Sequence, residues 1–109
     1  MGELEKIRNA LLRFRNERDW EQFHNPKDLA IALNIESGEL LELFLWKDSK
    51  DAEILKVRDE LADILSFAFL IANYYKFDVT EIILDKIEKN AKKYPIEKSR
   101  GNARKYNEL

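Results

Sequence analysis

Turn-forming residues are scarce in this chain, and their scarcity restricts the folds open to it. Its 109 residues include only 3 Gly and 2 Pro. An all-β domain needs many turns, and Gly and Pro supply most of the backbone conformations that turns require. Apolar residues also recur at helical rather than alternating spacing. The sequence therefore predicts an all-α fold, in a single domain that spans residues 1–109.

Local start and stop signals place four helices along the chain. Asn25 followed by Pro26 is a strong start signal, because Asn caps free backbone N–H groups and Pro at the first position loses no hydrogen bond. Asp48 or Ser49 is the expected cap of a third helix. Asp78 and Thr80 offer caps for a fourth, which Pro95 ends. The predicted helices cover residues 3–18, 26–46, 50–76 and 78–94.

The third predicted helix contains the most apolar stretch of the chain. Residues 61–75 read LADILSFAFLIANYY, with apolar side chains pointing in nearly every direction around a helix. A helix of this kind is expected to be covered on all sides. With 45% hydrophobic residues the chain can build a core, but 109 residues give a marginal one. We therefore expect a four-helix bundle that associates as a homo-oligomer.

Composition excludes several classes of function. The chain has no Cys, which excludes disulfides, thiolate metal sites and a cysteine nucleophile. Its single His, His24, excludes a multi-histidine metal site and is interpreted as structural. The first residues are charged throughout, and no stretch is long and apolar enough for a membrane span. We expect a cytoplasmic protein without a membrane partner.

Basic residues are concentrated near the C-terminus. Residues 89–105 hold seven Lys or Arg against one acid, although the whole chain has a net charge of −2. Residues 95–109 are polar and are predicted to form a basic C-terminal arm, either ordered or mobile. Such a segment suits a polyphosphate ligand, an RNA contact, or a solvated helix end whose lysines complement the helix dipole.

Four acids stand at positions where apolar residues are expected. Glu36 and Glu39 lie within the apolar stripe of the second helix, and Glu60 and Asp63 lie three apart on the third. Residues at i and i+3 share a helix face, so each helix presents a pair of like charges. Only Glu60 has a Lys or Arg three or four positions away, which is Lys56.

Unpaired acids of this kind have two interpretations. In a chain with 37% charged residues they can be ordinary surface groups. Alternatively, a cation absent from the sequence balances them, because burying an unpaired carboxylate is costly. Carboxylate oxygens suit Mg²⁺, and Mn²⁺ fits the same ligands. A di-iron carboxylate site would add Glu-x-x-His pairs, which this chain lacks. We favour the metal site.

The acidic motifs resemble those of a known family. Glu36-Ser-Gly-Glu39 and Glu60-Leu-Ala-Asp63 resemble the paired motifs of the MazG-like nucleoside triphosphate pyrophosphohydrolases. Three further stretches resemble the dCTP pyrophosphatase branch of that family, so the resemblance covers most of the chain. These stretches are residues 18–24 (RDWEQFH), 39–46 (ELLELFLW) and 89–106, from KNAKKYP to the closing RGNARKY.

The resemblance implies hydrolysis of a nucleoside triphosphate, dCTP or a modified dCTP, to the monophosphate and pyrophosphate. It implies Mg²⁺ bound by Glu36, Glu39, Glu60 and Asp63, a base pocket lined by Trp20 and Trp46, and phosphate contacts from Lys86 and Asn90. Glu39 is the preferred proton acceptor for the attacking water. Family members are similar in forming dimers or tetramers, with substrate sites near the subunit contacts.

Two positions depart from the animal dCTP pyrophosphatases. Leu11 stands in place of a base-contacting His, and Phe67, a predicted substrate contact, stands in place of Tyr. Both changes remove a hydrogen-bonding group, and such groups are what give a site strong discrimination. The alternative from another class is a helical module that binds protein or RNA without catalysis, although nucleic acid is not our expected partner.

Overall fold

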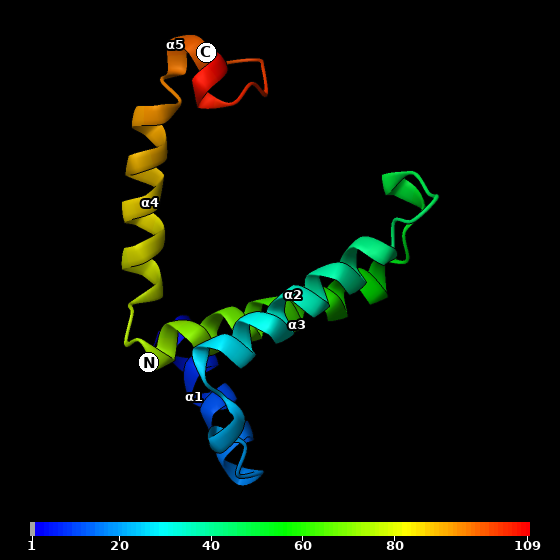
Figure 1. Cartoon of the computed structure of the whole chain (residues 1–109), viewed down its shortest axis with the longest axis vertical. Coiled ribbons are helices and arrows are strands. Elements are labelled where there is room, and N and C mark those ends of the chain that lie inside the picture. Colours follow the sequence, from blue (N-terminus) through cyan, green and yellow to red (C-terminus); the bar gives the residue numbers. More distant parts are fainter. Residues whose placement is uncertain (1) are drawn as a thin grey trace. The chain divides into compact units, whose positions relative to one another are not determined.

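A computed structural model describes residues 2–109 of the protein (Figure 1). Within that range it contains helices and turns and no strand, so the all-α prediction is confirmed. The four long helices are α1 (Glu3–Glu17), α2 (Pro26–Glu42), α3 (Ile54–Tyr74) and α4 (Val79–Lys93). Four short helices complete the structure: α5 (Ile96–Ser99) and the 3-10 helices η1 (Glu21–Phe23), η2 (Ser49–Asp51) and η3 (Tyr106–Glu108).

Side-chain caps start two of the long helices, as the sequence predicts. The Asn25 side chain accepts a hydrogen bond of 2.9 Å from the Asp28 backbone N–H, and Pro26 follows as the first residue of α2. At the start of α4, the Asp78 carboxylate accepts a bond of 2.9 Å from the Glu81 backbone N–H. Each cap satisfies a backbone donor that has no partner within the helix.

The boundaries between α2 and α3 differ from the prediction. Helix α2 ends at Glu42 instead of Trp46, and α3 begins at Ile54 instead of Lys50. After Glu42 the backbone bonds span three residues instead of four, and Trp46 adopts a positive φ of 59° that no α-helix contains. The predicted cap at Asp48 or Ser49 is wrong as well, because Asp48 precedes η2 and makes no side-chain cap bond.

The described chain forms two compact units, one ending at Lys76 and the other spanning Phe77–Leu109. In the first unit, α3 packs along α2 and also contacts α1. The single-domain prediction and a bundle of all four long helices stay predictions, because the structure does not define how the two units are placed.

The core of the described chain lies in the first unit, between α2 and α3. Its buried apolar residues are Leu29 of α2 and Leu70 and Ala72 of α3, which are 2%, 8% and 6% exposed. Closer to the start of α3, Leu61 and Leu65 are 46% and 50% exposed. Within the first unit alone this helix is therefore not covered on all sides, because α1 and α2 cover only part of its surface.

The second unit contains an ordered C-terminal arm. After α5, Gly101 adopts a φ of 80°, and the Asn102 side chain accepts a bond of 3.1 Å from the Arg104 backbone N–H. The arm then brings the Tyr106 ring edge-on to Tyr94, with ring centroids 6.2 Å apart. Of the two forms predicted for residues 95–109, the structure has the ordered one. Across residues 2–109, no helix has both the length and the apolar character needed to span a membrane.

Candidate functional site

Three of the four predicted metal ligands meet where α2 packs on α3. Glu36 of α2 and Glu60 and Asp63 of α3 each contribute one carboxylate oxygen to a group whose members lie within 4.8 Å of one another. Glu36 and Glu60 are half-buried and Asp63 is exposed. We call these three residues the carboxylate cluster. It forms because the i, i+3 spacing turns Glu60 and Asp63 toward the same side of α3.

The neighbouring acids change the pKa of Glu36. Its pKa is raised from 4.5 to about 7, chiefly because a protonated Glu36 can donate a hydrogen bond to the Glu60 carboxylate. Burial and a further hydrogen bond to Glu39 act in the same direction, as do the negative charges of Glu39 and Glu60. Glu39 itself is exposed, one turn along α2. Glu39 thus lies near Glu36 but outside the carboxylate cluster.

No basic side chain within residues 2–76, the described part of the first unit, forms an ion pair with these acids. The ion pairs in that range join Arg8 to Glu5, Arg15 to Glu21, and Lys56 to Glu53. Lys56 is the one cation in helical reach of Glu60, yet its Nζ lies 3.1 Å from a carboxylate oxygen of Glu53. The Oε2 atoms of Glu36 and Glu60 are buried without a hydrogen-bond partner. These unpaired buried oxygens fit a divalent cation that prefers oxygen ligands.

The two tryptophans predicted to line a base pocket lie near opposite ends of α2. Trp20 precedes the helix and packs edge-on against Phe14 of α1, with ring centroids 5.7 Å apart. Trp46 follows the helix in a turn, and it is 94% exposed. The 17 residues of α2 span about 25 Å, so one chain does not bring Trp20 and Trp46 together.

The other residues predicted to contact the substrate lie partly in the first unit and partly in the second. Phe67 is half-buried on α3, four residues after Asp63 and on the same face. Lys86 and Asn90 lie one turn apart on α4, and both are exposed. Because α4 belongs to the second unit, the approach of these two residues to the carboxylate cluster stays a prediction.

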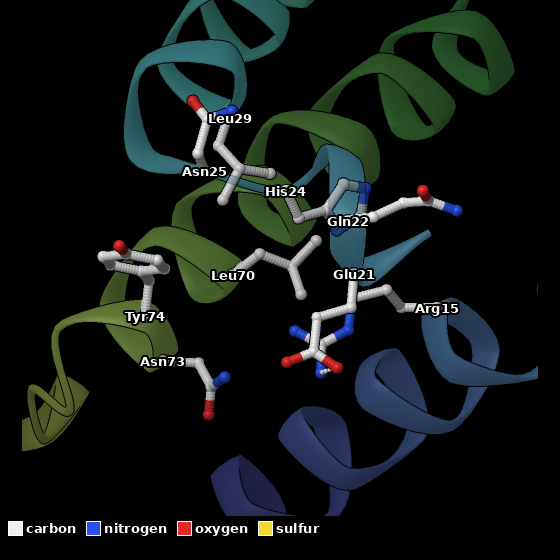
Figure 2. A pocket seen from close by; sticks show the side chains of 9 residues that line it. All are labelled: Arg15, Glu21, Gln22, His24, Asn25, Leu29, Leu70, Asn73 and Tyr74. Carbon is white, nitrogen blue, oxygen red and sulfur yellow. Dashed lines mark ion pairs between the residues drawn. The ribbon is translucent and has the colours of Figure 1, made fainter. Parts of the chain in front are cut away.

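A pocket that the sequence analysis missed lies in the first unit (Figure 2). It has a volume of about 310 Å³ and is bounded by the loop after α1, the start of α2 and the end of α3. Its lining includes Arg15, Glu21, His24, Leu29, Leu70 and Asn73. The one available signal was Asn73, a polar residue inside the apolar run 61–75. The other polar groups are distant in sequence and meet only through helix packing.

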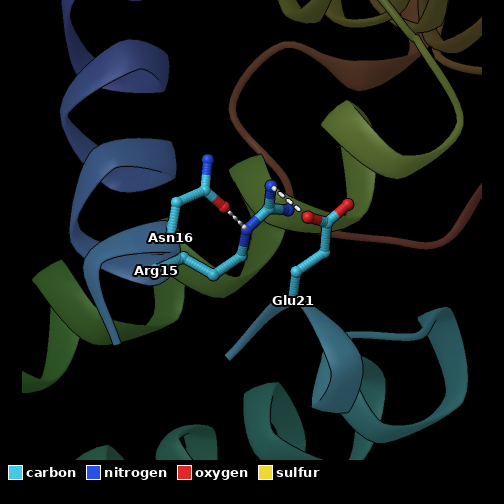
Figure 3. A network of polar contacts seen from close by, with 3 residues as sticks. All are labelled: Arg15, Asn16 and Glu21. Atoms are coloured by element: carbon cyan, nitrogen blue, oxygen red, sulfur yellow. Dashed lines mark hydrogen bonds and ion pairs between the residues drawn. The ribbon is translucent and has the colours of Figure 1, made fainter. Parts of the chain in front are cut away.

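One wall of this pocket is fixed by Arg15. Its Nη2 lies 3.7 Å from a Glu21 carboxylate oxygen, and its Nε donates a bond of 3.0 Å to the Asn16 side chain (Figure 3). The Arg15 backbone carbonyl accepts a bond of 3.0 Å from the Trp20 N–H. These contacts tie the loop that carries Trp20 to the end of α1.

His24 forms part of the pocket on the same side. Burial and the neighbouring positive charge of Arg15 both lower its pKa below the usual value of 6.5, so the ring is neutral near pH 7. Its Nδ1 atom is buried and has no hydrogen-bond partner within the described residues.

Comparison with known proteins identifies the family of the chain. Residues 31–109 match the MazG-like family. Bovine (Bos taurus) dCTP pyrophosphatase 1 is 40% identical over 114 residues, which cover 97% of this chain and 68% of that protein. The human (Homo sapiens) dCTP pyrophosphatase 1 is 39% identical over 97% of this chain and 67% of its own length. The chain therefore belongs to the MazG-like family, as its acidic motifs predict.

The fold agrees with that assignment. The crystal structure of a pyrophosphatase from Archaeoglobus fulgidus superposes with a TM-score of 0.79 and 34% sequence identity. The match covers 87% of this chain and 94% of the archaeal one. An all-helical chain with unpaired acids on two packed helices is thus similar in sequence and in structure to pyrophosphatases.

Proposed function

We propose that this protein is an enzyme that hydrolyses a nucleoside triphosphate, dCTP or a modified dCTP, to the monophosphate and pyrophosphate. The observation that carries the proposal is the carboxylate cluster, with three carboxylates from two helices within 4.8 Å and two buried oxygens without a partner. Membership of the MazG-like family and the likeness to dCTP pyrophosphatases support the same reaction.

We propose Mg²⁺ as the cofactor, with Mn²⁺ as a substitute. Glu36, Glu60 and Asp63 would hold it, and Glu39 is close enough to Glu36 to influence its protonation. A divalent cation bound there would neutralise charge on the phosphate oxygens and acidify a bound water. All of the donors are carboxylate oxygens, which suits these two ions better than softer metals.

The other residues of the site have roles in binding and proton transfer. Glu39, which is exposed and outside the carboxylate cluster, is the proposed acceptor of the proton from the attacking water. Lys86 and Asn90 are the proposed phosphate contacts, and the positive charge of Lys86 would stabilise the leaving pyrophosphate.

The family resemblance indicates that aromatic side chains contact the base of the substrate. Trp20, Trp46 and Phe67 are its proposed contacts. Leu11 and Phe67 lack the hydrogen-bonding groups that the animal enzymes have at these two positions. Since Trp20 and Trp46 lie near opposite ends of α2 in one chain, a base that touches both would take Trp46 from a second copy.

We also propose that the protein is a homo-oligomer, either a dimer or a tetramer. Helix α4 carries large apolar residues that no other element of the second unit covers, namely Ile82, Ile83, Leu84 and Ile87. Exposed apolar area of this extent in so small a chain favours association. Light scattering coupled to gel filtration would give the mass, and a monomer at micromolar concentration would contradict this part of the proposal.

The decisive experiment is a product assay with a panel of nucleoside triphosphates and Mg²⁺. We expect monophosphate and pyrophosphate, with a pyrimidine deoxynucleotide ranked first. Asp63→Asn removes one charge from the carboxylate cluster, so we expect it to abolish turnover while the metal-free fold stays as stable or becomes more stable. Asp48→Asn is the matched control, because Asp48 is exposed and makes no cap bond.

The alternative, a helical module that binds protein or RNA without catalysis, predicts no turnover with any triphosphate. Release of orthophosphate instead of pyrophosphate would mean that the bond between the α and β phosphates is not the one cleaved. Full activity in Asp63→Asn would mean that the metal ligands are assigned wrongly.

A further inference from the structure

The C-terminal arm of the second unit folds back onto the last turn of α4. Gly101 turns the chain with its φ of 80°, and the ring of Tyr106 then lies edge-on to Tyr94, with ring centroids 6.2 Å apart. The Nζ atom of Lys93 lies 5.0 Å from the centroid of the Tyr106 ring, which is a cation–π contact. Tyr106 is 52% exposed, so this contact lies at the surface of the unit. The arm therefore holds the side chain of Lys93 at the end of α4.

Lys93 continues a row of polar residues along one face of α4. Lys86, Asn90 and Lys93 follow one another at intervals of four and three residues, so their side chains share a face of the helix. All three residues are exposed. Lys86 and Asn90 are the proposed phosphate contacts, and Lys93 lies two turns, or about 10 Å, beyond Lys86. A linked chain of phosphates that contacts the first two residues can therefore extend toward the third.

The positive charge of Lys93 has no acidic partner within the second unit. Lys92, the preceding residue, has Glu88 four positions before it, at the spacing of helical ion pairs. Lys93 has no acid three or four positions before it, and Lys86 has none on either side. None of the ion pairs lies within residues 77–109 of the described chain. An aromatic ring attracts an ammonium group but has no net charge, so Lys93 keeps its full charge for an anion.

We propose that Lys93 is an additional contact for the pyrophosphate part of the substrate, and that Tyr106 of the C-terminal arm is the residue that positions it. The inference rests on the proposed function, in which Lys86 and Asn90 contact the phosphates. A freely rotating Lys loses side-chain entropy when it binds an anion, and a side chain that is already held over a ring loses less. Tyr106 thus acts through Lys93 without touching the substrate itself.

A simpler interpretation is that Lys93 only complements the dipole of α4. Lys92 and Lys93 both lie in the last turn of the helix, where a positive charge is favourable. That interpretation treats the two lysines alike. Their positions differ, because successive residues are 100° apart and Lys92 is turned away from the face that carries Lys86 and Asn90. It is also Lys93 whose Nζ atom lies over the Tyr106 ring. Lys92 and Lys93 therefore form a matched pair for an experiment.

The test measures the binding of inorganic pyrophosphate to the full chain by isothermal titration calorimetry, with Mg²⁺ present. We expect Lys93→Gln to raise the dissociation constant about tenfold, since a charge-assisted hydrogen bond is lost. Lys92→Gln, the matched control, should bind as wild type does. Tyr106→Leu should raise the dissociation constant about threefold, the size expected for a cation on an exposed ring. Tyr106→Phe keeps the ring and should bind as wild type does.

Equal losses in Lys93→Gln and Lys92→Gln would overturn the proposal, because they would indicate a general attraction of the helix end for anions. Wild-type affinity in folded Tyr106→Leu would overturn the role of Tyr106. Nuclear magnetic resonance of wild type covers the case in which Tyr106→Leu does not fold, since an aromatic ring shifts the protons of a methylene group above it upfield. Ordinary shifts for the Lys93 side chain would also overturn that role. Failure of the proposed function is a separate result, because it appears as absence of pyrophosphate release from any triphosphate, whatever the binding data.

Discussion

Protonation of Glu36 should control cation binding near neutral pH. Its pKa is about 7 because the Glu60 carboxylate and burial favour the protonated form. A carboxyl must lose its proton before it can act as a metal ligand. Below pH 7, each unit of pH should therefore weaken cation binding about tenfold, through competition with a single proton. Above about pH 8 the affinity should no longer depend on this group.

Manganese provides the probe for this experiment, because free Mn²⁺ is counted directly by electron paramagnetic resonance. Dissociation constants between pH 5.5 and pH 8.5 should give a slope of one logarithmic unit per pH unit below pH 7 and a plateau above it. Glu36→Gln should bind Mn²⁺ weakly at every pH and lose the slope. Glu17→Gln, an exposed glutamate at the end of α1, should behave as wild type.

The raised pKa of Glu36 also predicts how the stability of the fold depends on pH. The dependence is opposite in sign to that of a salt-bridged acid, whose pKa is lowered. The folded state binds this proton more tightly than the unfolded state, whose pKa is 4.5. The stabilisation is therefore complete below pH 4.5 and is lost as the pH rises through 7. We expect the melting temperature of the metal-free protein to fall over this interval, and Glu36→Gln to reduce the fall. A Mn²⁺ affinity that is constant from pH 5.5 to pH 8.5 would refute the whole argument.

Two further predictions concern the fold. Asn25→Ala removes the cap of α2 and should lower the free energy of unfolding by about 1 kcal/mol, as measured by urea denaturation. Asn25→Ser, which retains a capping oxygen, should recover most of that loss. Leu29→Ala empties the most buried position of the core and should lower the free energy of unfolding by about 2–5 kcal/mol. The equivalent change at the exposed Leu41 should have little effect, and equal losses at the two positions would mean that the core is placed wrongly.

The parts of the fold that depend on local chemistry could be predicted from the sequence. Asn25 and Asp78 cap their helices through neighbours three residues away, so the interaction is already contained in the sequence. The end of α2 could not be predicted in this way. The apolar residues continue to Trp46, but the backbone changes to shorter hydrogen bonds after Glu42, a change that periodicity does not reveal.

The candidate site likewise has one part that the sequence predicts and one part that it does not. The carboxylate cluster could be predicted because Glu36 and Asp63 lack basic neighbours at helical spacing, which is a property of the sequence itself. The pocket could not, because Arg15, His24 and Asn73 come together only when α1, α2 and α3 pack. Asn73 lines the pocket together with side chains that are about fifty positions or more away in the sequence, and sequence spacing does not reveal such contacts.

The acids and the exposed leucines of α3 lie on different faces of the helix, so one helix can carry both an acidic site and an apolar surface. Successive residues are 100° apart, so Leu61 and Leu65 point almost directly away from Asp63. The face with Asp63 and Glu60 packs toward Glu36 on α2, whereas Leu61 and Leu65 are left half exposed by the other helices of the first unit. A second copy that covers the leucines would therefore leave the carboxylate cluster open to substrate. Association and metal binding would then use different surfaces of the same helix, so the apolar run 61–75 could contain Asp63 without either function blocking the other.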